Sequence, residues 1–327
     1  MSGKSKDKAD LRIGVLLINM GGPENLGEVR GFIRNLFLDP HIIEKSKLFR
    51  KFLAFIISTF RSKKEKKHYQ AIGGGSPLKQ WTSLQAEKTG KKLSERKNNM
   101  VFRTAYSYSE PHIGEALAEL STMNLDRILA FPLYPQYSKA TLGSIYSDLA
   151  EANRMLKLSG NLITLPPFYE HRGYIESSVD MLERALMKID TSKPYHVIFT
   201  AHALPQKLIE QGDPYGMHVS RTVYLILRRF PVENYTIAFQ SKIGPVKWMQ
   251  PSTIETVQEV ARQGIKQLLV MPIGFVCDHI ETLYELDIEL AGIAKKAGVE
   301  TFVRANVFND DDSFIEFMAN YIEEHLK

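Results

Sequence analysis

The segment Arg12-Ile13-Gly14-Val15-Leu16-Leu17-Ile18-Asn19-Met20, followed by Gly21-Gly22-Pro23, is the first of eight similar apolar runs in this chain. A short apolar run closed by turn-forming residues is typical of a buried β-strand. The other runs are at 101–107, 127–133, 161–165, 196–200, 236–240, 267–273 and 301–307. Helix-length segments lie between them, for example at 111–123, 143–157, 174–189, 214–229, 252–263 and 281–296. This alternation predicts βαβ units and parallel sheets.

The eight predicted strands form two groups of four, on either side of residue 170. The chain has 327 residues, which is enough for two domains of about 160 residues each. We therefore predict an α/β protein with two similar Rossmann-like domains, residues 1–170 and 171–327. Each has a four-stranded parallel sheet flanked by helices. A single barrel fits less well, because the gaps between strands are uneven.

The composition is that of an ordinary globular protein, with 44% hydrophobic and 24% charged residues. These values exclude disordered and collagen-like chains. Cys277 is the only cysteine, which excludes an intramolecular disulfide and favours a reducing, cytoplasmic setting. The polar residues 1–10 resemble no signal region, and the longest apolar run of the basic segment, 52–57, is far shorter than the roughly 20 residues of a membrane span. We expect a protein that neither is secreted nor crosses a membrane.

The net charge of +5 is the sum over two segments of opposite charge and the rest of the chain. Residues 45–67 hold nine Lys or Arg and one acid, Glu65, which gives +8 for this segment and −3 for the rest of the chain. Residues 278–289 hold five acids and no Lys or Arg. Nucleic-acid binding is disfavoured, since no recognised motif accompanies the basic segment and the rest of the chain is acidic.

The basic segment has the apolar spacing of a helix and allows three interpretations. It packs on its own domain, lies on an anionic membrane surface, or forms an apolar lip over a pocket. The acidic segment 278–289 also allows more than one interpretation. Asp278 and Glu281 are explained by a capping box, whereas Glu285 and Glu289 are not. Spaced four residues apart, these glutamates share a helix face and are able to attract a divalent cation.

In doubly wound folds ligands bind beyond the carboxyl ends of the strands. The residues that follow the predicted strands include His202, which is able to exchange protons or bind a metal near neutral pH. Together with the glutamates it is a candidate iron site. Trp248 lies in another loop of this kind and is able to stack on a flat ligand. The glycine-rich stretches 21–23 and 73–77 match neither the dinucleotide fingerprint nor a P-loop, so they support no nucleotide cofactor.

Together these motifs resemble the ferrochelatase family, in family order and over residues 11 to 289. The stretches that carry the resemblance are Ile18-Asn19-Met20-Gly21-Gly22-Pro23, Ile72-Gly73-Gly74-Gly75-Ser76-Pro77, Leu133-Tyr134-Pro135-Gln136-Tyr137-Ser138, Ala201-His202-Ala203-Leu204-Pro205, Gln240-Ser241-Lys242-Ile243-Gly244-Pro245 and Asp278-His279-Ile280-Glu281-Thr282-Leu283-Tyr284-Glu285-Leu286-Asp287. The resemblance implies a chelatase-like fold with porphyrin between the halves. It also implies insertion of Fe²⁺ into protoporphyrin IX, the last step of haem synthesis.

The resemblance assigns site residues position by position. His202 and Glu281 match the catalytic pair, which either takes up pyrrole protons or holds the metal. Asp278, His279, Glu285 and Glu289 match an acidic helix with a π-type widening, interpreted as a metal or proton path. The positions that match the porphyrin pocket or its lip are Met20, Ile33, Leu36, Arg61, Tyr69, Ser76, Tyr108, Tyr134 and Trp248.

The chain also departs from some family members. Ser107 stands where animal members have an Arg, which removes one expected propionate contact. With Cys277 alone we expect no four-cysteine iron–sulfur cluster, as in bacterial members without one, and no cofactor, because iron is the substrate. Two alternatives remain: a chelatase of another tetrapyrrole such as coproporphyrin III, and a non-catalytic haem or metal carrier. We further expect a cytoplasmic protein that is able to contact the anionic inner membrane face through residues 45–67.

Overall fold

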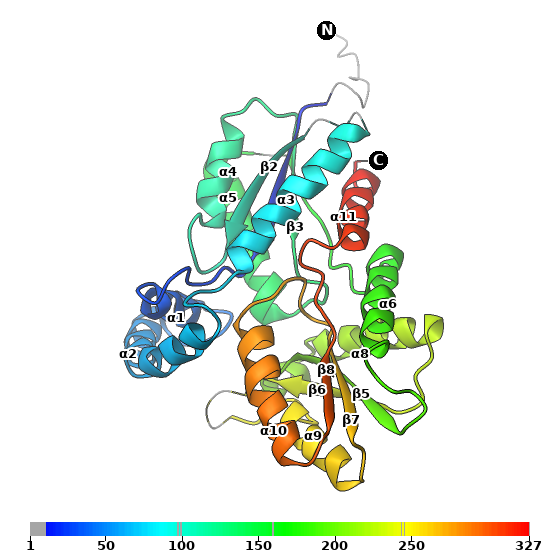
Figure 1. The fold of residues 1–327 in the computed structure, drawn as a ribbon. Coiled ribbons are helices and arrows are strands. Elements are labelled where there is room, and N and C mark those ends of the chain that lie inside the picture. Colours follow the sequence, from blue (N-terminus) through cyan, green and yellow to red (C-terminus); the bar gives the residue numbers. More distant parts are fainter. Residues whose placement is uncertain are drawn as a thin grey trace.

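A computed structural model describes residues 11–96, 98, 100–158, 160–242, 244 and 246–326 of the chain. Residues 1–10, 97, 99, 159, 243, 245 and 327 lie outside the described residues. Two of them, Ile243 and Pro245, belong to the stretch 240–245 that carries part of the resemblance. The described chain forms two four-stranded sheets, which Figure 1 shows one above the other with helices around them.

The first sheet has the strand order β2-β1-β3-β4, and its registered pairs are all parallel. Its central strand β1 is completely buried, which explains why its sequence is almost continuously apolar. The strands are β1 (Ile13–Asn19), β2 (Met100–Tyr106), β3 (Arg127–Pro132) and β4 (Leu162–Thr164).

The second sheet has the order β6-β5-β7-β8 and is also parallel. Numbered within each half, the two sheets share one order, in which the first strand lies between the second and the third. The strands are β5 (Tyr195–His202), β6 (Tyr235–Gln240), β7 (Gln267–Pro272) and β8 (Thr301–Arg304). The predicted fold class, with eight strands in two similar parallel sheets, is confirmed.

Helices connect the strands and cover the sheets. In the first half they are α1 (Val29–Leu38), α2 (Lys47–Ala71), α3 (Leu78–Glu95), α4 (Ile113–Ser121), the short π-helix η2 (Lys139–Gly143) and α5 (Ser144–Leu156). In the second half they are α6 (Arg172–Leu186), α7 (Gln206–Glu210), α8 (Tyr215–Arg229), α9 (Thr253–Arg262), the π-helix η3 (Glu281–Leu290), α10 (Ala291–Lys296) and α11 (Asp312–Glu324).

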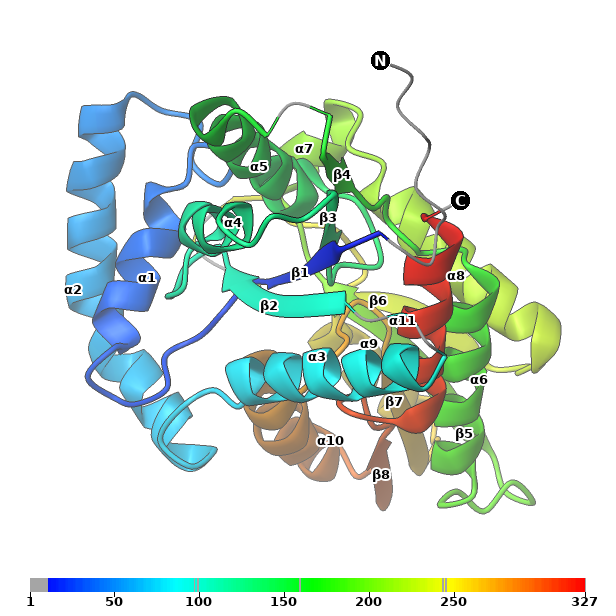
Figure 2. The same cartoon turned by 90° about the horizontal axis from the view of Figure 1, so that it is seen from above.

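The C-terminal helix α11 joins the two halves. It packs against both α3 and α6, as Figures 1 and 2 show. Lys92 of α3 forms an ion pair with Glu316 of α11 over 2.8 Å. Because α11 also belongs to the packing of the first half, the division at residue 170 stays a prediction.

The segment 281–296, predicted as one helix, changes its winding partway along. Residues 281–290 form the π-helix η3 and residues 291–296 continue as the α-helix α10. A π-helix bonds each amide five residues back instead of four, is rare, and is found mostly at functional sites.

Helix α2 carries the basic segment and extends along one side of the molecule with α1, as Figure 2 shows. It packs on α1 and buries only Ala54, Ser58 and Tyr69. Five of its large apolar side chains are instead exposed: Leu48, Phe49, Phe52, Phe55 and Phe60. Within the described residues, no helix has the length and apolar composition needed to cross a membrane.

Candidate active site

The carboxyl ends of the two sheets face each other. Asn19, the last residue of β1, donates from Nδ2 to the Sγ of Cys277, in the loop after β7, over 3.7 Å. The predicted site therefore lies where the two halves meet, as is usual for ligands of doubly wound folds.

His202 and Glu281 form the centre of this site. His202 is the last residue of β5, and Glu281 is the first residue of η3. The His202 Nδ1 and Glu281 Oε2 atoms are 2.7 Å apart, a hydrogen bond within normal range. The His202 side chain is one-third exposed, whereas that of Glu281 is 13% exposed. The pair thus combines a buried carboxylate with an imidazole that an incoming ligand is able to reach.

Each member of the pair shifts the titration of the other. Burial lowers the pKa of His202, but the charge of Glu281 and the hydrogen bond to it outweigh this effect, so the pKa is raised overall. Burial raises the pKa of Glu281, but His202, His279 and the hydroxyl of Ser241 outweigh it and lower the pKa. Glu281 is therefore a carboxylate at neutral pH, and His202 holds a proton more readily than a free imidazole.

Ser241 connects Glu281 to the next glutamate of η3. Its hydroxyl lies 3.1 Å from the Oε2 atom of Glu281 and 2.5 Å from the Oε2 atom of Glu285. The amide of Gln240 donates to the Glu281 carbonyl and to Glu285 over 3.0 and 3.2 Å. Ser241 has φ of +70°, a left-handed conformation that is uncommon outside glycine and clusters at functional sites.

Glu285 titrates differently from Glu281. Burial and the nearby charge of Glu281 raise the pKa of Glu285 to about 7. Two carboxylates that share one hydroxyl are thus held in different protonation states near neutral pH.

The other predicted members of the metal or proton path are His279, Glu289 and Asp278, and they lie in three different surroundings. His279 is buried, and its Nε2 atom is 3.9 Å from the Oε1 atom of Glu281; burial lowers the pKa of His279 and favours its neutral form. Glu289 lines a surface pocket with Glu285. Asp278 instead faces Arg304, Asn309 and Thr282, which bond both of its carboxylate oxygens.

That surface pocket, of about 270 Å³, lies between α2 and η3. It also contains Arg61 and Lys64 of α2, so basic side chains of α2 and the glutamates of η3 line the same pocket. Arg61 forms an ion pair with Glu65 over 2.7 Å. Arg61 is the one predicted porphyrin position in this pocket.

Two predicted porphyrin positions are close to the acidic cluster. The charge of Glu281 is among the causes that raise the pKa of both Tyr69 and Tyr134, after burial. Tyr69 also packs with Ile33 of α1 and with Ile280, the residue before η3. Residues of α1 and α2 thus form a cluster against the residue that precedes the π-helix.

The remaining predicted porphyrin positions lie beyond the strand ends or on α1. Tyr108 donates from its hydroxyl to Asp39 over 2.7 Å, and its backbone amide bonds the carbonyl of Met20. Ser76 is buried beneath Gly22, where an added Cβ would lie 2.7 Å from the Ser76 Cβ. Trp248 pairs with Pro205, three residues after His202, and Leu36 lies on α1.

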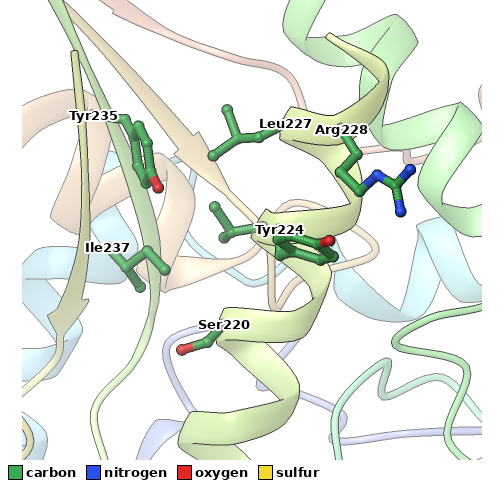
Figure 3. A pocket seen from close by; sticks show the side chains of 7 residues that line it. Ser220, Tyr224, Leu227, Arg228, Tyr235 and Ile237 are labelled. Carbon is green, nitrogen blue, oxygen red and sulfur yellow. The ribbon is translucent and has the colours of Figure 1, made fainter. Parts of the chain in front are cut away.

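A second pocket, shown in Figure 3, lies away from these residues. It has a volume of about 360 Å³ and lies between α8 and the edge strand β6, with Tyr224, Leu227, Tyr235 and Ile237 among its lining residues. No predicted site residue lines it.

Within the described residues, no group of three or more His, Cys, Asp or Glu side chains has the spacing of a closed metal site. His202 lies within hydrogen-bond distance of Glu281, and Glu285 reaches the same Ser241 hydroxyl as Glu281.

Sequence reasoning assigned no role in the site to three residues of this region. Gln240 and Ser241 were visible as polar residues after a strand, but the two bridged glutamates follow 40 or more residues later. Arg304 gave no local signal, because its partners lie in another element.

The fold is shared with solved chelatases. The sirohydrochlorin chelatase SirB from Bacillus subtilis subspecies spizizenii, in complex with cobalt, matches with a TM-score of 0.55 at 11% identity over 96% of this chain and 95% of that chain. CbiX, the terminal enzyme for siroheme biosynthesis in denitrifying bacteria, matches with a TM-score of 0.54 at 13% identity, over 96% and 100% of the two chains. Fold and site geometry thus define a two-domain protein with a chelatase-like fold.

The sequence comparisons are more specific. The ferrochelatase family model matches residues 12–326. Ferrochelatase of Aquifex aeolicus is 38% identical over 317 residues, 97% of this chain and all of that protein. Ferrochelatase of Picosynechococcus sp. is 40% identical over 321 residues, 97% of this chain and 83% of that protein. The chain belongs to the ferrochelatase family, the metal chelatases that make haem by iron insertion.

Proposed function

We propose that this protein inserts Fe²⁺ into protoporphyrin IX and releases two protons, acting as a lyase of the metal-chelatase type. The observation that carries the proposal is the His202–Glu281 pair at the junction of the two sheets, 2.7 Å apart and joined through Ser241 to Glu285. This arrangement offers a proton acceptor, a metal ligand and an outward row of acids in one place.

The chemistry requires removal of protons from the substrate. The free porphyrin carries two inner N–H groups, and both protons leave as the ion forms bonds to four ring nitrogens. We propose that His202 takes up these protons one at a time, passing the first on before it accepts the second, or holds the ion, with Glu281 compensating the charge. Distortion of the flat ring by contacts remote from its centre exposes the nitrogens, in the way that binding strain assists other reactions.

The reaction also needs a route by which the ion enters and the protons leave. We propose that Glu285 and Glu289 pass the ion inward or the protons outward, since Glu285 contacts the inner cluster and both line the outer pocket. His279 lies beside Glu281 and belongs to this path. Asp278 is bonded by Arg304, Asn309 and Thr282, which suits a structural role better than transport.

We propose protoporphyrin IX as the substrate because of the apolar side chains that α2 exposes. Exposed Phe49, Phe52 and Phe60 of α2 favour a ring with two carboxylates over coproporphyrin III, which carries four. The test is the ratio of kcat/KM for iron insertion into the two porphyrins. A higher value for protoporphyrin IX supports the proposal, and a higher value for coproporphyrin III contradicts it.

The raised pKa of Glu285 predicts a pH-dependent effect of Glu285→Gln. At pH 6 most of the parent carboxyl is protonated and resembles the amide, whereas at pH 8 it is a carboxylate. We expect Glu285→Gln to lower kcat by about tenfold at pH 8 and by no more than about twofold at pH 6.

Initial rates across this pH range measure the effect, with Glu170→Gln as the control, since Glu170 pairs with Arg221 on the surface. An equal loss at both pH values would argue against a titrating role for Glu285.

We also propose that α2 contacts anionic membrane from the outside, with the protein in the cytoplasm. Phe52 and Lys63 are both exposed and lie eleven residues apart, about three helical turns, and so share one face. Exposed aromatic and basic side chains on one helix suit the interface of an anionic bilayer, where each Lys or Arg contributes about 1 kcal/mol.

Co-sedimentation with vesicles tests this contact. The parent is expected to bind phosphatidylglycerol vesicles at low salt, to bind phosphatidylcholine vesicles weakly, and to lose binding in Phe49→Ser/Phe52→Ser. Met187→Ser, which changes the exposed apolar residue directly after α6, serves as the control. Equal sedimentation of the parent and the double variant would exclude α2 as the contact.

A further inference from the structure

Arg304 is the last residue of β8, and its side chain is only 11% exposed. Its guanidinium makes a two-pronged contact with Asp287 of η3: Nε donates to Oδ1 over 2.6 Å and Nη2 to Oδ2 over 2.8 Å. The third nitrogen, Nη1, lies 3.1 Å from the Oδ1 atom of Asp278. One cation thus holds two acids that flank Glu281 and Glu285. We call this arrangement the Arg304 clamp.

Asp278 is fixed in the clamp by further bonds. Its Oδ2 atom accepts from the Asn309 amide over 2.8 Å, and its Oδ1 atom from the Thr282 hydroxyl over 2.8 Å. The Asp278 backbone amide in turn donates to the Asn309 Oδ1 atom over 2.8 Å. The segment that enters η3 is therefore anchored to the loop after β8 by bonds that are partly buried.

The two acids lie at different places along this segment. Asp278 lies in the chain before η3, and Asp287 lies in the second half of η3. Because Asp278 is outside the helix, its position relative to Asp287 depends on the path by which the chain enters η3. A single guanidinium that bonds both acids ties the entry of η3 to its later turns and opposes a rewinding of the residues between them.

The winding in turn sets where the functional glutamates point. Glu281 and Glu285 both reach the Ser241 hydroxyl from η3, and Glu281 also reaches His202. An α-helix turns by a different angle per residue than a π-helix. Rewinding this segment as an α-helix would therefore turn the two glutamates away from each other and break these contacts. Buried π-helical turns need compensating contacts, since this winding is otherwise rare.

We propose that Arg304 is a positioning residue that holds η3 in its π winding and thereby keeps Glu281 and Glu285 directed at His202 and Ser241. The inference deepens the proposed function and rests on it for its kinetic consequence. The structural consequence, a locally less stable η3 without the clamp, is independent of the activity.

The experiment combines hydrogen exchange with kinetics on Arg304→Met, Arg304→Lys and Asp287→Asn. We expect amides of residues 279–290 to exchange at least about tenfold faster in Arg304→Met, with little change in β5 peptides, because local opening then precedes global unfolding. We expect kcat for iron insertion to fall about tenfold while the KM for porphyrin stays within about twofold. Arg304→Lys, which keeps the charge but not the two-pronged bond, is expected to be intermediate.

Arg221→Met is the matched control, since Arg221 forms an exposed ion pair with Glu170 over 3.2 Å. If Arg304→Met fails to fold because it leaves two acids unpaired, Asp287→Asn, which keeps the side-chain shape, still tests the clamp. Unchanged exchange in η3 for the folded variants, or a rise spread evenly over the whole chain, overturns the proposal. If η3 exchanges faster in Arg304→Met than in the parent but the parent itself forms no haem, the clamp is supported and the proposed function is contradicted.

Discussion

His202→Ala is expected to lower kcat for iron insertion by about a thousandfold, within the range that a positioned proton-transfer group contributes. The imidazole is the accessible member of the central pair, one-third exposed beside a carboxylate that is 13% exposed. Its pKa is raised by Glu281, so it is suited to hold a proton that leaves the porphyrin. Alanine removes both the base and any bond from the ring nitrogen to the ion.

The control for this variant is His196→Ala. His196 lies on the same strand, β5, but at its other end, where its Nε2 atom contacts the Thr236 hydroxyl over 2.9 Å. His196→Ala tests the loss of an imidazole from β5 without a change at the site, and its kcat is expected to stay within about threefold of the parent. Partial recovery of His202→Ala by added imidazole would further indicate proton transfer. A His202→Ala variant with near-parental rate would remove this residue from the mechanism.

Glu281→Gln is expected to have the second largest effect, a loss of about a hundredfold in kcat. The amide keeps the size of the side chain but removes the negative charge that His202 and Ser241 contact. Without that charge, the charge of Glu285 is left to raise the pKa of His202 against burial, so this pKa should fall below the parental value. The imidazole then holds a transferred proton less well.

Two measurements test this variant. Initial rates give the change in kcat, and an NMR titration of the His202 ring gives the direction of its pKa shift. Glu300→Gln, on an exposed loop in weak contact with Lys266 at 3.9 Å, serves as the control for loss of one acid. A His202 pKa that stays constant or rises in Glu281→Gln would contradict the electrostatic coupling of the pair.

The sheets could be predicted because buried parallel strands leave a strong local signal. β1 is buried along its whole length, so its apolar run coincides with the strand to within one residue at each end. The position of His202 after a strand was visible for the same reason. No local pattern joins His202 to Glu281, which lies 79 residues further along the chain; the chemistry of the two residue types and the resemblance suggested the pair.

The winding of residues 281–290 was not available from spacing alone. Glu281, Glu285 and Glu289 fit one face of an α-helix, and only the resemblance indicated the π winding. The position of Ser241 after a predicted strand was visible, but its bridging role was not. Its left-handed backbone is usually supplied by glycine, so a serine does not mark such a turn.

For the basic segment 45–67, the sequence indicated the secondary structure but not the role. Its helical period was readable, but three interpretations remained, because periodicity does not state which face is covered. The structure shows that α2 buries small residues such as Ala54 against α1 and exposes Phe52 and Phe60. This finding disfavours the interpretation of a helix that only packs on its own domain.

Haem formation under anaerobic conditions, with Fe²⁺ and protoporphyrin IX in at least tenfold excess over protein, tests the central claim most directly. The account predicts that haem absorbance grows far beyond one equivalent per chain, at a steady rate that His202→Ala abolishes and His196→Ala preserves. Absorbance that stops at one equivalent, or that grows equally with His202→Ala, would contradict the claim and identify the protein as a carrier of metal or haem.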